Sequence, residues 1–159
     1  MGYPPQGFGS AFLYKRTMLF IDGGYLRTRL REITGNEDFD PINLYRKIES
    51  KLLEPGHRWD LIRIYYYDAI YDKNKVAKEE YEAMAQYFDK LRDINFIEVK
   101  LGELVSSPKE DRQKGVDTLL AIDMLTKAYE NHYDIAILLS GDRDLIPLVK
   151  AVKDQAGKN

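Results

Sequence analysis

Four short apolar segments recur along the chain, and stretches with the spacing of helices separate them. The segments at residues 18–21, 61–67 and 134–139 are mostly apolar, which is typical of strands buried on both faces of a parallel sheet. Residues 96–101 alternate between apolar and polar side chains, which indicates a half-exposed strand at a sheet edge. The pattern therefore predicts four strands.

Helices are predicted between and after these strands. Asp40-Pro41 is a strong start signal, because Asp caps a helix and Pro fits its first position, and Pro55-Gly56 ends that helix. Strands that alternate with helices predict an α/β fold, with a parallel sheet and right-handed crossovers. The predicted helices cover residues 25–33, 41–54, 74–92, 116–129 and 145–156.

Three segments lie outside this pattern. Residues 1–16 contain several glycines and prolines and are predicted to form a flexible tail before a single domain at 17–159. Residues 105–115 are predicted to form a polar loop, long enough to suggest a functional or mobile role. Gly157 is predicted to cap the last helix, where a further strand is expected. Either the sheet has four strands, or a natural variant or shortened form lacks the last segment, or a partner supplies a strand.

Composition narrows the function classes. The chain of 159 residues has no cysteine, which excludes disulfides and Cys-based metal sites, and its only histidines are His57 and His132. A His-based zinc site or a Ser-His-Asp triad would depend on one of these two isolated residues. The formal charge of −2 does not indicate nucleic-acid binding. A cluster of acidic residues at a metal site would, however, offset the charge of basic residues around it, so the net charge does not exclude such binding. No apolar run approaches ~20 residues, so no membrane span and a cytoplasmic location are expected.

Aspartates follow the ends of several predicted strands. Asp22, Asp68 and Asp142 stand at strand ends, and Asp117 lies in the first turn of a helix that starts at the same sheet edge. Because the carboxyl ends of parallel strands meet at one edge, these carboxylates are expected to converge there. Close carboxylates require a cation or shared protons, and hard oxygen ligands suit Mg²⁺ or Mn²⁺. Such a site can activate water and stabilise a phosphodiester transition state.

Each aspartate also has a structural explanation. Asp22 and Asp144 are favourable caps or first-turn residues of helices, and Asp68 fits an ordinary surface loop. Asp123 lies in a mostly buried helical run and requires a partner, which Lys127 would supply four residues later.

Three motifs together resemble the NYN domain of the LabA-like group, within the PIN-like nuclease superfamily. The motifs are at residues 20–26, at 114–117 with Asp123, and at 138–145. The resemblance implies a three-layer fold, in which helices flank a parallel sheet with strand order 3-2-1-4. A fifth strand usually follows the fourth. It also implies a metal-dependent ribonuclease site with Asp22, Asp117 and Asp142 as its acidic core and Asp144 beside them. Asp123 matches a second acidic position often seen in that helix.

Four residues are the candidates for substrate contacts. Tyr25 stands where the family often has Asn, and its ring would narrow the site or stack on an unpaired base. Lys114 and Arg143 lie next to proposed metal ligands and would contact phosphates, and Ser140 lies within the third motif. Other basic residues expected near the same edge would either contact phosphates or simply form a solvated rim. These residues are Arg27, Arg31, Lys109 and Arg112.

The leading hypothesis is therefore a Mg²⁺- or Mn²⁺-dependent ribonuclease that acts on RNA. The main alternative is a catalytically inactive module of the same fold that binds RNA or protein. A phosphatase of the haloacid-dehalogenase type is disfavoured, because it needs a second Asp where this chain has Gly24. A homodimer through the open sheet edge or the N-terminal tail is compatible with each hypothesis.

Overall fold

A computed structural model describes the backbone of residues 11–103 and 109–159 and the side chains of residues 11–102 and 115–159. Within these ranges the four predicted strands form one parallel sheet in the order β3-β2-β1-β4, so the predicted α/β fold and strand order are confirmed. Residues 1–10 of the predicted flexible tail at 1–16 lie outside the described residues, and the prediction is wrong from Leu13 onward, where β1 begins. The strands are β1 (Leu13–Asp22), β2 (His57–Ile70), β3 (Ile97–Glu103) and β4 (Ile135–Leu139).

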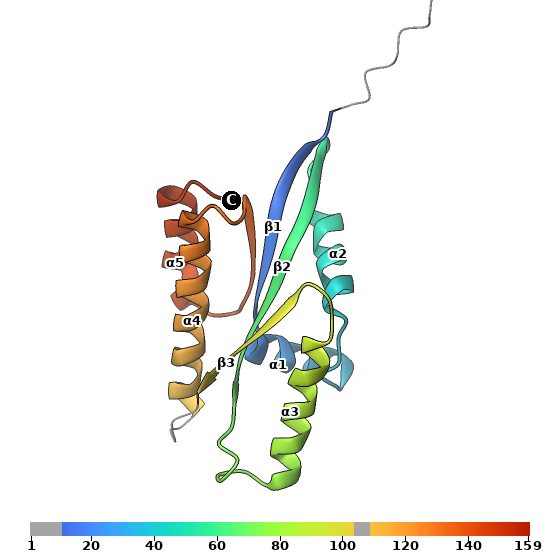
Figure 1. Ribbon diagram of the computed structural model, residues 1–159, viewed down its shortest axis with the longest axis vertical. Helices are drawn as coiled ribbons and strands as arrows, with labels where there is room; N and C mark the ends of the chain where they lie inside the picture. The colour runs from blue at the N-terminus through green and yellow to red at the C-terminus, as the bar shows by residue number, and fades with distance from the viewer. Residues whose placement is uncertain (1–10, 104–108) are drawn as a thin grey trace, which may run out of the picture.

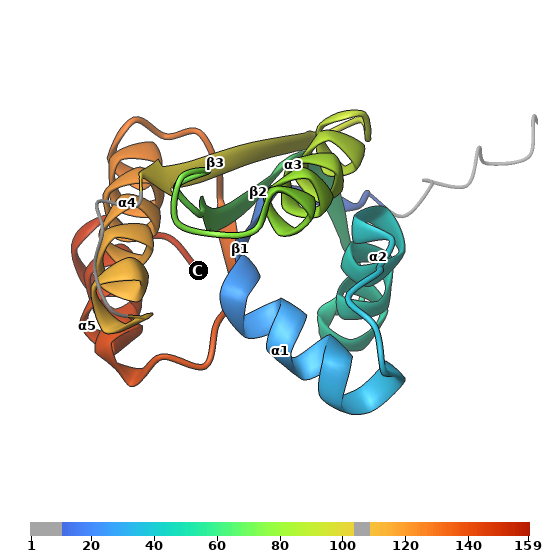
Figure 2. The ribbon, with the colours of Figure 1, turned by 90° about the horizontal axis from the view of Figure 1, so that it is seen from below.

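Helices cover both faces of the sheet, which gives the expected three layers (Figures 1 and 2). On one side lie α1 (Gly23–Thr34), α2 (Pro41–Leu52) and α3 (Lys78–Arg92). On the other side lie α4 (Lys109–Tyr129) and the last helical segment. That segment consists of a 3₁₀ turn, η1 (Arg143–Leu145), then α5 (Ile146–Lys150) and a π-helical turn, η2 (Ala151–Gln155).

Two apolar cores lie on the two faces of the sheet. Side chains alternate across a strand, so Phe20 joins the core beneath α4 while its neighbours Leu19 and Ile21 join the core beneath α1 and α3. All three side chains are fully buried, which explains why the sequence of β1 is continuously apolar here.

The strands β1 and β2 and the helix α4 begin several residues earlier than the sequence predicts. The first four residues of β1 pair with β2, from Leu13↔His57 to Arg16↔Asp60, in a two-stranded ribbon beyond the end of β4. Apolar periodicity does not mark this ribbon, because little of it is buried. The prediction of a polar loop at 105–115 is wrong from Lys109 onward, where α4 begins; most of these polar residues are good helix formers.

The last residue lies against the open edge of β4. The N–H of Asn159 donates to the carbonyl of Asp134 at 3.2 Å, and the N–H of Ala136 donates to the carbonyl of Asn159 at 2.8 Å. These two bonds pair Asn159 with β4 in the parallel sense, on the side opposite β1. In the described part of the chain the sheet has four strands, and this edge of β4 is where a fifth would pair.

Phe20 allows a test of the core beneath α4. Its ring stacks on Tyr65 at 5.4 Å between centroids and meets Tyr133 edge-on at 5.8 Å. We expect Phe20→Ala to lower the free energy of unfolding by about 3–5 kcal/mol, because it leaves a cavity in a close-packed core. Ile33→Ala is the control, since Ile33 is 73% exposed, and should change it by less than about 0.5 kcal/mol. Equal effects in urea titrations would contradict this description of the core.

Candidate functional site at the carboxyl edge of the sheet

Asp22 joins two chain segments at the carboxyl edge of the sheet. Its Oδ1 accepts a hydrogen bond from the Tyr25 N–H at 3.2 Å, so Asp22 is the N-cap of α1. Its Oδ2 accepts a hydrogen bond from Ser140 Oγ at 3.2 Å, in the segment after β4. The side chain is buried, and this burial raises the pKa of the carboxyl, although the two hydrogen bonds oppose the change. Asp22 is therefore both a cap and part of an acidic cluster.

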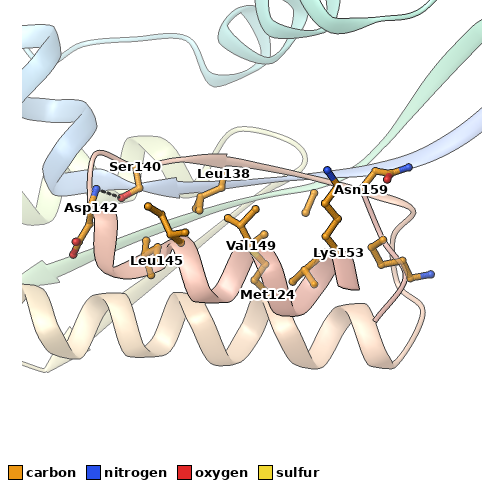
Figure 3. A pocket seen from close by; sticks show the side chains of 12 residues that line it. Met124, Leu138, Ser140, Asp142, Leu145, Val149, Lys153 and Asn159 are labelled. Atoms are coloured by element: carbon orange, nitrogen blue, oxygen red, sulfur yellow. Dashed lines mark hydrogen bonds between the residues drawn. The ribbon is translucent and has the colours of Figure 1, made fainter. Parts of the chain in front are cut away.

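The segment after β4 carries the next two carboxylates. The N–H of Asp142 donates to Ser140 Oγ at 3.1 Å, as Figure 3 shows. Asp142 Oδ1 in turn accepts from the Asp144 N–H at 2.8 Å and caps η1. Ser140 therefore bridges Asp22 and the backbone of Asp142, which fixes the distance between β1 and the turn after β4.

Asp117 comes to the same place from α4. Its pKa rises to about 7, first because the carboxyl is partly buried and second because it shares a hydrogen bond with Asp142. The negative charges of Asp22, Asp142 and Asp144 raise it further. Asp22, Asp117, Asp142 and Asp144 therefore lie close enough for their charges to act on one another, and we name this set the acidic cluster.

The acidic cluster fits a hard divalent cation by its donor chemistry, since its side chains offer only carboxylate oxygens. The pKa of Asp117, raised to about 7, means that its carboxyl favours the protonated form below neutral pH. In the described residues, no three His, Asp or Glu side chains already lie close enough to coordinate one ion. Binding would therefore require the proton to leave and the carboxylates to move closer.

Asp68 does not belong to the acidic cluster. Arg27 binds it with Nε at 2.8 Å and a terminal nitrogen at 2.9 Å, and Tyr66 donates to it at 3.0 Å. The predicted surface-loop position is wrong, because β2 continues to Ile70 and the Asp68 side chain is only 3% exposed. Arg27 neutralises a buried carboxylate, so this guanidinium is not free to contact a phosphate. Asp68 also raises the pKa of Arg27, against the effect of burial.

Asp123 also has its own partners. Lys100 on β3 lies 2.6 Å from Asp123 Oδ2, and the Tyr67 hydroxyl on β2 donates to the same oxygen at 2.9 Å. The predicted pairing with Lys127 is wrong, because the ammonium of Lys127 lies over the Tyr65 ring, 4.9 Å from its centroid. A contact between sheet and helix has replaced the expected contact along the helix.

Tyr25 packs against the turn that carries Asp142. A Cβ atom at Gly141 would lie 2.7 Å from Tyr25 Cδ2 and would overlap the ring. The half-buried ring therefore rests on the backbone of Gly141, beside the acidic cluster. Of the predicted phosphate contacts, Arg143 is exposed on η1 and Arg31 is paired with Glu37. The side chains of Lys109, Arg112 and Lys114 lie outside the described residues.

A groove beside the acidic cluster was not predicted. It has a volume of about 370 Å³ and runs between the open edge of β4 and the last helical segment (Figure 3). Ser140 and Asp142 lie at one end, and Lys153 and Asn159 lie at the other. Its lining residues are mainly apolar, and two of these residues, Ile146 and Val149, are exposed. Sequence periodicity assigns such residues to a helix face but does not show that the face borders a groove.

The contact between Tyr25 and Gly141 predicts a coupled pair. Gly141→Ala should lower the free energy of unfolding by about 1–3 kcal/mol, because the added methyl displaces the ring. In a Tyr25→Ala background the same substitution should change the free energy of unfolding little, because the ring that the methyl would meet is absent. Gly115→Ala, which adds a methyl in open space, is the control. Equal costs of Gly141→Ala in both backgrounds, measured by urea unfolding, would contradict the contact.

The pKa of Asp117 predicts a pH dependence. This carboxyl is protonated in the folded chain up to about pH 7 but ionises near pH 3.8 when unfolded. Stability should therefore fall as the pH rises from about 4 to about 7 and remain lower above that window. The fall in melting temperature between pH 5 and pH 8 should be smaller in Asp117→Asn than in the parent chain. An equal fall in both proteins would show that Asp117 does not carry this proton.

The chain is similar to known proteins in both sequence and fold. The NYN domain model matches residues 16–159 of the chain. The fold is similar to that of a Vibrio parahaemolyticus protein of unknown function, with a TM-score of 0.60 and 19% sequence identity, over 91% of this chain and 78% of that one. No curated protein matches. None of the described helices has the length and apolarity needed to cross a membrane.

The family assignment agrees with the four parallel strands, their order and the two helical layers. NYN domains are generally nuclease-like members of the PIN-like superfamily, whose nucleases usually use divalent metals. On the match over residues 16–159, the chain belongs to the NYN domain family.

Proposed function

We propose that this chain is a metal-dependent ribonuclease whose acidic cluster holds Mg²⁺ or Mn²⁺. Asp22, Asp117 and Asp142 would be the ligands, and Asp144 would stand beside them as a further acidic group. When bound, the cation would activate water and offset the charge that develops on the phosphodiester. The three sequence motifs support a place for the chain within the LabA-like group of NYN domains.

The charge balance of the sheet edge carries this proposal. Two of the nearby carboxylates have a cation from the chain itself, Arg27 for Asp68 and Lys100 for Asp123. The four carboxylates of the acidic cluster have no ion pair with any described basic side chain, and Asp117 keeps a proton instead. Crowded carboxylates without a protein cation are the arrangement that a divalent ion would relieve.

Ser140 and the turn after β4 would orient the ligands. The hydroxyl of Ser140 donates to Asp22 and accepts from the backbone of Asp142, so it sets the spacing of two ligands that are far apart in sequence. The Tyr25 N–H donates to the other oxygen of Asp22 and fixes the plane of that carboxylate. These bonds would keep Asp22 and the turn that carries Asp142 near each other while the carboxylates close around a cation.

RNA with unpaired bases is the proposed substrate. The ring of Tyr25 lies beside the acidic cluster and would stack on a base that is free of a duplex. Arg143 is exposed next to Asp142 and would contact a phosphate, and Lys114 is proposed for the same role from its place in the sequence.

The second candidate is a binding module that performs no chemistry. The observation in its favour is the position of Tyr25, whose ring rests on Gly141 and would narrow the approach to Asp142. Such a module would bind RNA with the same affinity in the presence of a chelator.

Cleavage of a 5′-labelled single-stranded RNA in the presence of Mn²⁺ tests the proposal. The parent chain should cleave, EDTA should abolish cleavage, and Asp142→Asn should lower the rate by at least about a hundredfold, because even indirect changes at metal sites cost 10–100-fold. An RNA duplex of the same sequence should be cleaved more slowly.

Asp154→Asn is the matched control, since Asp154 is exposed on η2, outside the acidic cluster. It should retain the parent rate. Equal activity of the parent chain and Asp142→Asn would reject the ribonuclease proposal. Binding without cleavage, unaffected by EDTA, would support the binding module instead.

A further inference from the structure

Asp123 is a charged group through which α4 contacts the sheet. Between Val116 and Leu125 the helix sequence is mostly apolar, yet Asp123 is only 15% exposed and faces β2 and β3. The ammonium of Lys100 and the hydroxyl of Tyr67 both bind its Oδ2 atom, at 2.6 and 2.9 Å. A half-buried carboxylate with two partners on one oxygen is a fixed contact point.

We propose that Asp123 is a positioning residue, which fixes α4 on the sheet so that Asp117 faces the other members of the acidic cluster, and that it is not a metal ligand. The inference rests on the proposed function. It gives Asp123 a role different from that of Asp117, although both are acidic residues of one helix.

Helix geometry separates the two carboxylates. Six residues along an α-helix correspond to an advance of about 9 Å and a rotation of about 240°. Asp117 and Asp123 therefore leave α4 at different heights and in different directions. Asp117 reaches Asp142, whereas Asp123 reaches the strands. One ion cannot take both as direct ligands without a large movement of the helix.

A second contact fixes the helix on the other side of Asp117. A Cβ atom at Gly102 would lie 3.3 Å from Val116 Cγ2, so α4 approaches the end of β3 closely at this point. Gly102 and Lys100 are two residues apart and face the same side of the sheet. Asp117 thus lies between two points at which α4 is held on β3, one apolar and one charged.

Substitutions in the ion pair of Lys100 and Asp123 distinguish a positioning role of Asp123 from a role as a metal ligand. Removal of the lysine alone leaves a partly buried carboxylate without its cation, which disturbs the local structure. Neutralising both members restores the charge balance, and an Asn at 123 can still accept the hydrogen bond from Tyr67. A positioning role therefore predicts a defect in each single variant and recovery in the double variant.

Mn²⁺ binding to the full chain, measured by titration, is the test. Lys100→Met and Asp123→Asn should each raise the Kd for Mn²⁺ by about three- to tenfold, the size expected for coupling between contacting residues. The double variant should return to within about twofold of the parent. Lys127→Met is the control, because its ammonium lies over the same Tyr65 ring as that of Lys100, and should leave the Kd unchanged.

A direct ligand would give another pattern. Asp123→Asn would weaken Mn²⁺ binding whether or not Lys100 is present, and Lys100→Met would leave binding unchanged or tighten it by freeing the carboxylate. Either result would overturn the proposal, as would a normal Kd in both single variants.

Thermal unfolding without metal provides a second measurement. The shift in melting temperature of the double variant should be clearly smaller than the sum of the shifts of the two single variants. Additive shifts would contradict the contact between Lys100 and Asp123. If the parent chain binds no Mn²⁺, the proposed function fails. In that case the melting temperatures alone test the contact between Asp123 and Lys100, and additive shifts would show that the contact does not hold α4 on the sheet.

Discussion

The compensation of negative charge at the carboxyl edge of the sheet is the constraint on which the rest of this structure depends. Strand ends and helix starts favour aspartate for local reasons, because its side chain caps exposed N–H groups. A parallel sheet then collects these aspartates at one edge. The fold pairs Asp68 with Arg27 and Asp123 with Lys100, whereas the crowding of Asp22, Asp117, Asp142 and Asp144 raises the pKa of Asp117.

Local and functional roles coincide in the same side chains. Asp22 and Asp142 are both N-caps, and the hydrogen bonds that cap α1 and η1 also fix the carboxylates of the acidic cluster. Ser140 connects the two caps, although it lies 118 residues from Asp22 in the sequence. A structural explanation for such an aspartate therefore does not compete with a functional one, since the cap provides the orientation that a ligand would need.

Much of this arrangement was predictable from local patterns. The four strands, their parallel sense and the convergence of Asp22, Asp117 and Asp142 follow from apolar runs and from the rule that parallel strands end at one edge. Partners were less predictable, because contacts between strands and helices depend on register. Asp123 pairs with Lys100 across two elements, and Lys127, which is close in sequence, binds a different group.

The sequence by itself determined the order of elements and the residue types at the sheet edge, because burial and capping act over a few neighbouring residues. Only the tertiary structure decided which carboxylates are neutralised by the chain and which stay crowded together. It also placed the ring of Tyr25 on Gly141 and left a groove along the open edge of β4. These features depend on distances between segments far apart in the chain, which packing of the whole domain sets and no local pattern encodes.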